Sequence, residues 1–121
     1  MNVIALLLAL FPLAASGGDP VRGEQVVLAR GDGNCLLCHA VPGAGRPSGS
    51  VGPSLAGVGS RLSADEIRLR IADPTRFNAG SVMPSYGRTD GLRKVASQYR
   101  GKPLLSEREI DDAVSFLLTL K

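Results

Sequence analysis

The segment Cys35-Leu36-Leu37-Cys38-His39 constrains this chain more than any other. Two thiols stand three residues apart and an imidazole directly follows the second, which is the spacing of a c-type haem attachment site. Each thiol can add to one vinyl group of the porphyrin, and the imidazole is then held under the ring within reach of the iron. The chain has 2 cysteines and 1 histidine, all of them in this segment. The motif therefore predicts one covalent haem c, attached through Cys35 and Cys38 with His39 as an axial ligand.

Three other interpretations of the cysteine pair remain open. A thioredoxin-type redox disulfide sits near a βαβ pattern, and the sequence shows no such pattern. A structural zinc ion takes four ligands, so a carboxylate would have to complete the set of two thiolates and one imidazole. A plain disulfide across two intervening residues is strained. Haem attachment is favoured over all three.

The N-terminus resembles an export signal. Residues 1–16 carry no charged side chain, and a nearly unbroken apolar run extends from Val3 to Leu13. This run is about half as long as the ~20 residues that a membrane-spanning helix needs. Small residues follow, which predicts a signal peptide over residues 1–16, cleavage near Ser16 or Gly17, and a periplasmic domain over 17–121. No Lys or Arg precedes the run, so an uncleaved anchor is the alternative; after cleavage we expect no stable membrane insertion.

The composition fits a small domain that binds an apolar cofactor. The chain has no Trp, and a domain of this size buries only a modest core, to which a porphyrin would add apolar surface. The net charge is +3, and the basic residues are not interleaved with aromatic ones, which disfavours a nucleic-acid partner. Residues 88–102 carry five basic residues and one acidic residue, a pattern typical of either a solvated surface or a contact with an acidic partner.

Two helices are expected in the first half of the domain. Asp19 as N-cap and Pro20 at the first helical position predict a helix over residues 21–30. Gly23 inside it costs about 1 kcal/mol relative to Ala, which suggests that another side chain comes close to its backbone. A second helix begins at Ser63, where the sequence matches a capping box, and ends at Asp73-Pro74.

The last helix is expected from Ser106, with a second capping box and an apolar face. Its single aromatic residue, Phe116, is expected to meet Gly23 where the two helices cross. A short helix is also suggested between Leu92 and Tyr99. Residues 41–60 and 76–88 are expected to be irregular, although Val51, Leu55 and Val58 in the first of these loops need burial. No strand is predicted, so the fold class is all-α.

Met83 is the natural sixth ligand of the iron. It is the only methionine after residue 1, and it lies in an irregular segment that could reach over the porphyrin. A thioether stabilises ferrous iron and raises the reduction potential. The alternatives are that Met83 only fills the core, as many methionines do, and that Lys94, Lys102 or an open site takes its place.

The domain resembles the class I cytochromes c, and within them the SoxX family, which is the small monohaem subunit of the SoxAX complexes of bacterial sulfur oxidation. The resemblance rests on five segments of this sequence: Gly33–Ala40, Val51–Gly59, Val82–Tyr86, Arg88–Leu92 and Gly101–Leu105. It implies the class I cytochrome c fold, with three to five helices around one covalent haem c.

The resemblance also implies roles for individual residues. His39 and Met83 would ligate the iron. The carbonyl of Pro53 would accept a hydrogen bond from the His39 ring N–H that the iron does not use. Leu55 would pack on the ring. Arg61 and Asn78 would be partners of the haem propionates, and for Arg61 a solvated surface charge is an equally good interpretation.

The function implied is electron transfer as one subunit of a thiosulfate-oxidising complex, an L-cysteine S-thiosulfotransferase system. A larger SoxA-like subunit would carry the reactive cysteine-ligated haem, and this chain would receive electrons and pass them to an acceptor cytochrome. Catalysis by this chain alone is not expected. The alternatives are a diffusible monohaem carrier unrelated to sulfur oxidation, and a small-ligand haem enzyme or sensor with an open iron site.

Overall fold

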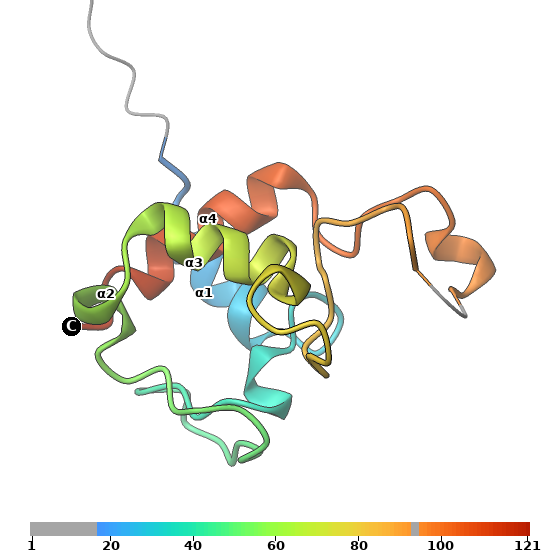
Figure 1. Cartoon of the computed structure of the whole chain (residues 1–121). Coiled ribbons are helices and arrows are strands. Elements are labelled where there is room, and N and C mark those ends of the chain that lie inside the picture. The colour runs from blue at the N-terminus through green and yellow to red at the C-terminus, as the bar shows by residue number, and fades with distance from the viewer. Residues whose placement is uncertain (1–16, 93–94) are drawn as a thin grey trace, which may run out of the picture.

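The computed structural model describes residues 17–92 and 95–121, so the expected signal peptide lies outside the described residues. Four α-helices are present: α1 (Pro20–Leu28), α2 (Val58–Arg61), α3 (Ala64–Ala72) and α4 (Glu107–Leu117) (Figure 1). Short 3-10 turns are η1 (Cys35–Leu37), η2 (Pro74–Arg76) and η3 (Ser97–Tyr99). The described residues contain no strand, which confirms the all-α prediction. None of their helices has the length and apolar character that a membrane span requires.

Helices α1 and α4 cross and form the centre of the core (Figure 1). Val27 of α1 and Ile110 of α4 are the largest fully buried side chains. A Cβ atom at Gly23 would overlap the backbone carbonyl of Asp112 and lie 2.9 Å from Cβ of Phe116. The prediction that Gly23 and Phe116 meet at the crossing is therefore confirmed, and the glycine is explained by the closeness of the two backbones.

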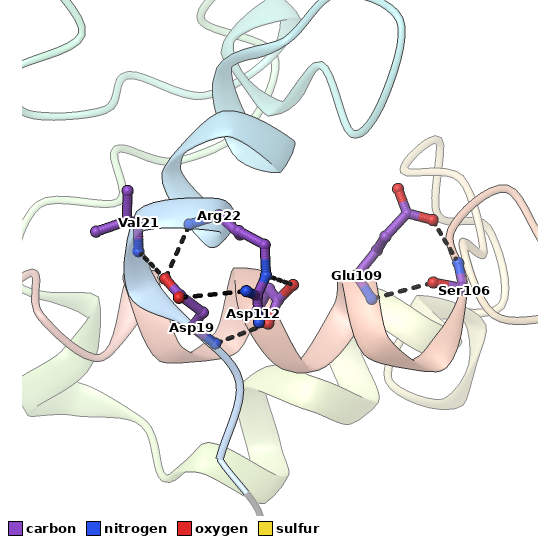
Figure 2. Close-up of polar contacts among 6 residues, drawn as sticks. All are labelled: Asp19, Val21, Arg22, Ser106, Glu109 and Asp112. Carbon is purple, nitrogen blue, oxygen red and sulfur yellow. Dashed lines mark hydrogen bonds and ion pairs between the residues drawn. The ribbon is translucent and has the colours of Figure 1, made fainter.

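Polar contacts fix the start of α1 on α4 (Figure 2). The Asp19 carboxylate accepts the backbone N–H groups of Val21, at 2.8 Å, and Arg22, at 3.1 Å, which confirms the predicted N-cap. The buried Asp112 carboxylate accepts the backbone N–H of Asp19, at 2.7 Å, and Nε–H of Arg22, at 3.2 Å. Burial opposes ionisation of Asp112, but these donors outweigh it and hold the pKa of Asp112 below its usual value.

The two predicted capping boxes differ. In α4 the Glu109 N–H donates to Ser106 Oγ at 3.1 Å and the Ser106 N–H donates to Glu109 Oε1 at 3.0 Å, so the box is complete (Figure 2). At α3 the Glu66 N–H donates to Ser63 Oγ at 3.2 Å, but the Glu66 carboxylate accepts the Ser63 hydroxyl instead of its backbone N–H. The prediction of a full box at Ser63 was wrong, because the Ser63 hydroxyl, at 3.1 Å, takes the carboxylate that the backbone N–H would have used.

Two helix boundaries also differ from the prediction. Helix α1 ends at Leu28, two residues early, because Ala29 is extended and the chain turns back so that the Gly33 N–H donates to the Val26 carbonyl at 3.0 Å. Helix α2 lies at the end of the predicted 41–60 loop. It starts after Gly57, whose left-handed φ of 70° is easily adopted only by glycine.

Two expectations based on apolar residues were wrong. A short α-helix was expected between Leu92 and Tyr99, but the described residues of this stretch form only the η3 turn. Both side chains are exposed, so the apolar pattern there has no core to pack against, and short helices depend on such packing. Val51 was expected to be buried, but it is 71% exposed, whereas Val58 is buried and Leu55 is half-buried.

Candidate haem site

The cysteine motif forms one tight turn after α1. Asn34 adopts a left-handed conformation, with φ of 47°, and starts η1. The N–H groups of Cys38 and His39 both donate to the Cys35 carbonyl, at 3.1 and 2.9 Å. Tyr86 holds the entry to this turn, because its buried hydroxyl donates to the Gly33 carbonyl at 2.6 Å. The turn places the two thiols and the imidazole at the i, i+3 and i+4 positions of one compact segment.

The state of the thiols argues against the other interpretations of the motif. Both cysteines are free and half-buried. Burial raises the pKa of the Cys35 thiol to about 11, whereas a redox-active cysteine needs a lowered pKa. Over residues 17–92 and 95–121, no three His, Cys, Asp or Glu side chains converge as a metal site would require. Cys35 therefore lacks the lowered pKa of a redox-active cysteine, and the described residues gather no further ligands for a zinc ion beside the motif.

The imidazole of His39 is oriented by the loop that follows it. Its Nδ1 lies 2.6 Å from the carbonyl oxygen of Pro53. Because a carbonyl oxygen only accepts hydrogen bonds, Nδ1 is the donor of this contact, which leaves Nε2 as the ring nitrogen that can bind a metal. This is the contact that the resemblance implied, and it sets the tautomer that a metal-bound histidine needs.

Gly52 makes room for that ring, a role that the sequence reasoning missed. A Cβ atom at Gly52 would lie 2.6 Å from Nδ1 and 2.8 Å from Nε2 of His39. The Gly52 N–H also donates to the Cys38 carbonyl at 2.8 Å, so the loop backbone runs directly beside the motif. The signal that could have identified it was a glycine immediately before Pro53.

Leu55 lies in the loop before α2, and Arg61 is the last residue of α2. The Leu55 N–H donates to the Ala40 carbonyl at 2.9 Å, and its side chain packs on the core. The Arg61 guanidinium donates to the carbonyls of Ala56 and, at 3.5 Å, Ser54. Arg61 thus braces the backbone on both sides of Leu55, while its role toward a propionate stays a prediction.

The segment that carries Met83 is shaped by two small turns. Oδ1 of Asn78 accepts the Gly80 N–H at 3.0 Å, and Ser81 Oγ accepts the Met83 N–H at 3.2 Å. The Met83 side chain is half-buried and packs against the core. Asn78 is exposed and its oxygen serves this turn, so its role toward a propionate also stays a prediction.

Asp73 anchors the far end of this segment, and the sequence reasoning had seen it only as a helix end. Its carboxylate accepts the Thr75 hydroxyl and, at 3.3 Å, the Ser85 hydroxyl, and it lies 3.9 Å from Nη1 of Arg88. The Thr75 hydroxyl, followed by Arg88 and Ser85, lowers the pKa of Asp73. Ser85 is two residues after Met83, so Asp73 helps to set where the methionine segment leaves the core.

The residues present fit a covalently attached haem. The two thiols and the imidazole come from the turn of residues 35–39, the Pro53 carbonyl orients the imidazole, and a half-buried thioether comes from the Met83 segment. The required closeness of Gly52 to His39 shows that this geometry is built into the backbone.

Comparisons with known proteins agree with this chemistry. The cytochrome c family profile matches residues 20–121. A solved chain of SoxXA from P. pantotrophus is 30% identical, with a TM-score of 0.78, and the match covers 90% of this chain and 86% of that chain. The c-type cytochrome SorU from Sinorhizobium meliloti shares the fold, at 21% identity and a TM-score of 0.54, over 84% of this chain and 88% of that one. A search of curated proteins finds no match.

Proposed function

The chain belongs to the cytochrome c family and is SoxX-like, and from this premise we propose that it is the monohaem electron-transfer subunit of a two-subunit complex that oxidises thiosulfate. The likeness to the SoxXA structure, which extends over nearly all of both chains, carries the proposal. The segments Val82–Tyr86 and Gly101–Leu105, which resemble the SoxX family, support it further. With residues 1–16 as an export signal, the place of action is the periplasm.

In this proposal Cys35 and Cys38 would hold the haem as thioethers, and His39 Nε2 and Met83 Sδ would ligate its iron. A haem c would supply one-electron chemistry between ferric and ferrous iron. The Pro53 carbonyl accepts the hydrogen bond from Nδ1 of His39, which fixes the ring and would raise its basicity as a ligand. A thioether ligand would favour the reduced state, as an electron acceptor requires.

The remaining site residues position these groups. We assign Leu55 to packing on the ring, supported by its place on the core and by the Arg61 brace around it. Arg61 and Asn78 are assigned as donors to the propionates, since each carries side-chain N–H groups on the loops that flank the site.

Covalent sulfur chemistry belongs to another subunit. Joining thiosulfate to a carrier thiol forms an S–S bond and releases one proton and two electrons. Both thiols of this chain are committed to the cofactor, and both axial positions are filled by its own side chains in this proposal. The chain therefore accepts the electrons one at a time from the larger SoxA-like subunit and passes them to an acceptor cytochrome.

Co-purification tests the proposal. The chain with a C-terminal affinity tag is expressed in its native host under thiosulfate growth and recovered from the periplasm, with a tagged unrelated periplasmic cytochrome as control. We expect a larger c-type cytochrome to accompany only this chain, in a 1:1 ratio. Recovery of the chain alone, with its haem attached, would contradict the two-subunit assignment.

A further inference from the structure

Residues 88–92 and 95–104 project from the helical body as parts of one loop. In Figure 1 they form the orange segment that extends away from the four α-helices. The loop leaves at Tyr86 and returns at Leu105, both of them buried, and the Leu105 N–H donates to the Tyr86 carbonyl at 3.1 Å. We call the described part of this loop, residues 88–92 and 95–104, the arm. The two ends of the loop therefore meet at the core, where this hydrogen bond joins them.

Core packing does not explain the arm. Residues 96–104 are all exposed, and the only regular structure in the described arm is the η3 turn. Ordering the backbone costs conformational entropy at every residue, and burial offsets little of that cost here. Loops longer than about 12–15 residues without secondary structure of their own are usually functional in compact domains. The arm is therefore a candidate binding element.

The exposed side chains of the arm indicate the kind of partner. Leu92, Tyr99 and Leu104 are 39%, 42% and 43% exposed, and Arg100 and Lys102 lie between the last two. Asp90 is the single acidic residue of the arm. Apolar anchors with positive charges beside them fit a protein surface with an apolar pocket and a rim of carboxylates.

A membrane surface is the other occupant that these side chains fit, because apolar residues insert at the headgroup level while basic residues attract anionic lipids. The likeness of nearly the whole chain to a SoxXA structure favours a protein subunit, which the proposed function also requires.

The base of the arm is fixed beside the methionine segment. Arg88 donates to the Asp90 carbonyl at 3.0 Å and to Thr75 Oγ1 at 3.5 Å, and it lies 3.9 Å from the Asp73 carboxylate. Asp73 also accepts from Ser85, two residues after Met83. A partner held by the arm is therefore held next to the segment that carries the sixth ligand.

We propose that the arm is the docking element for the larger subunit, with Tyr99 and Leu104 as apolar anchors and Arg100 and Lys102 facing carboxylates of that subunit. This inference rests on the proposed function, because it takes the larger subunit as its occupant. It adds which surface of the chain makes the contact and what chemistry the partner must present.

The test measures binding of the haem-loaded mature chain to the purified larger subunit by calorimetry. Tyr99→Ser with Leu104→Ser removes the anchors, and Arg100→Glu with Lys102→Glu reverses the charges. The matched controls are Val21→Ser, an exposed apolar residue of α1, and Arg30→Glu, an exposed cation after α1. Visible spectra and thermal melting check that every variant is folded and loaded.

We expect each arm variant to weaken binding at least tenfold and the controls to leave it within twofold. In the charge-reversed variant, added salt should weaken binding less or even strengthen it, because salt screens the new repulsion. Arm variants that bind like the unmodified chain would overturn the docking role and leave the proposed function intact. Failure of the unmodified chain to bind would overturn both.

Binding to lipid vesicles tests a membrane as the alternative partner of the arm. The unmodified chain and the arm variants are mixed with vesicles of phosphatidylcholine and phosphatidylglycerol in a 3:1 ratio. Vesicle binding that is lost only in the arm variants, with subunit binding unchanged, would contradict the proposal and make the arm a membrane contact. Absence of vesicle binding, together with loss of subunit binding, supports it.

Discussion

The helical side of the molecule, where α1 and α4 cross, and the loop side, residues 31–57 and 77–87, are ordered by different forces. The crossing buries apolar side chains from both helices, and its closest approach is fixed by Gly23. The loop side adds Leu36, Val41 and Tyr86 to the core, and hydrogen bonds between its segments, such as Leu55 N–H to the Ala40 carbonyl, set its shape. The crossing therefore holds the larger share of the buried apolar side chains, while the residues of the candidate haem site lie in the loops.

Removing both attachment thiols should abolish haem attachment on the loop side and leave the α1–α4 crossing folded. In Cys35→Ser with Cys38→Ser no thioether can form, so acid–acetone extraction of the denatured protein should remove all haem, whereas the unmodified chain should keep one haem mass. Because α1 and α4 pack without these residues, helical circular dichroism should persist. Haem that washes out of the unmodified chain would contradict the covalent site, and complete loss of helicity in the variant would contradict the separation of the two sides.

Met83→Ala should change the iron without changing the crossing. If the thioether is a ligand, its loss should abolish the weak long-wavelength band of methionine-ligated ferric haem and lower the potential by on the order of a hundred millivolts. Val82→Ala, at the exposed neighbouring position, should do neither. An unchanged spectrum in the Met83 variant would mean that another group or none occupies the sixth position.

Gly23→Leu should destabilise the crossing without changing the ligands of the iron. Its side chain would overlap the Asp112 backbone, and overpacking of this kind costs about 1–3 kcal/mol or more in the free energy of unfolding. Gly31→Leu is the matched control, because a Cβ atom there meets nothing within 4 Å. Denaturant unfolding of the two haem-loaded variants measures their free energies of unfolding. A normal visible spectrum with lowered stability is expected, and equal stability of the two variants would remove the argument from the close crossing.

The same contrast explains what could be predicted from the sequence. Asp19, the Ser106–Glu109 box and the Gly23–Phe116 contact follow from local chemistry and helical periodicity, and the structure confirms them. The start of α2 depends on the left-handed Gly57, and the failure of a helix after Leu92 depends on the lack of a core beside it. Such features are set by tertiary surroundings, which periodicity does not contain.

The site shows a similar division. Cys35, Cys38 and His39 are evident from their spacing, and the Pro53 contact followed from family resemblance. Gly52 and Asp73 were missed because their roles arise from through-space neighbours, an imidazole thirteen residues earlier in the chain and a hydroxyl twelve residues later.

Gly52→Ala should disturb the imidazole while sparing the crossing. The added methyl group would displace the His39 ring from Pro53, and loss of such a partner costs roughly 10–100-fold in metal affinity. Protons compete with iron for the imidazole, so the acid midpoint of the low-spin spectrum should rise by about 1–2 pH units. Gly31→Ala is the control, and an identical midpoint in both would argue against a fixed ring.

The smallest effect expected is a pH dependence of the crossing. The pKa of Asp112 is lowered in the folded chain, so its contribution is present above its unfolded pKa of about 3.9 and is lost as the pH falls through the folded value. The free energy of unfolding should therefore fall less between about pH 6 and pH 3 in Asp112→Asn than in the unmodified chain. Equal slopes in the two proteins would contradict this role of Asp112.

The central claim, that this chain carries electrons and does not itself oxidise thiosulfate, is tested most directly by haem reduction. The haem-loaded chain is mixed anaerobically with thiosulfate and the carrier protein, with and without the larger subunit, and the ferrous absorption bands are followed in time. We predict thiosulfate-dependent reduction only when the larger subunit is present. Reduction at the same rate without it would contradict the account and make the chain an enzyme in its own right.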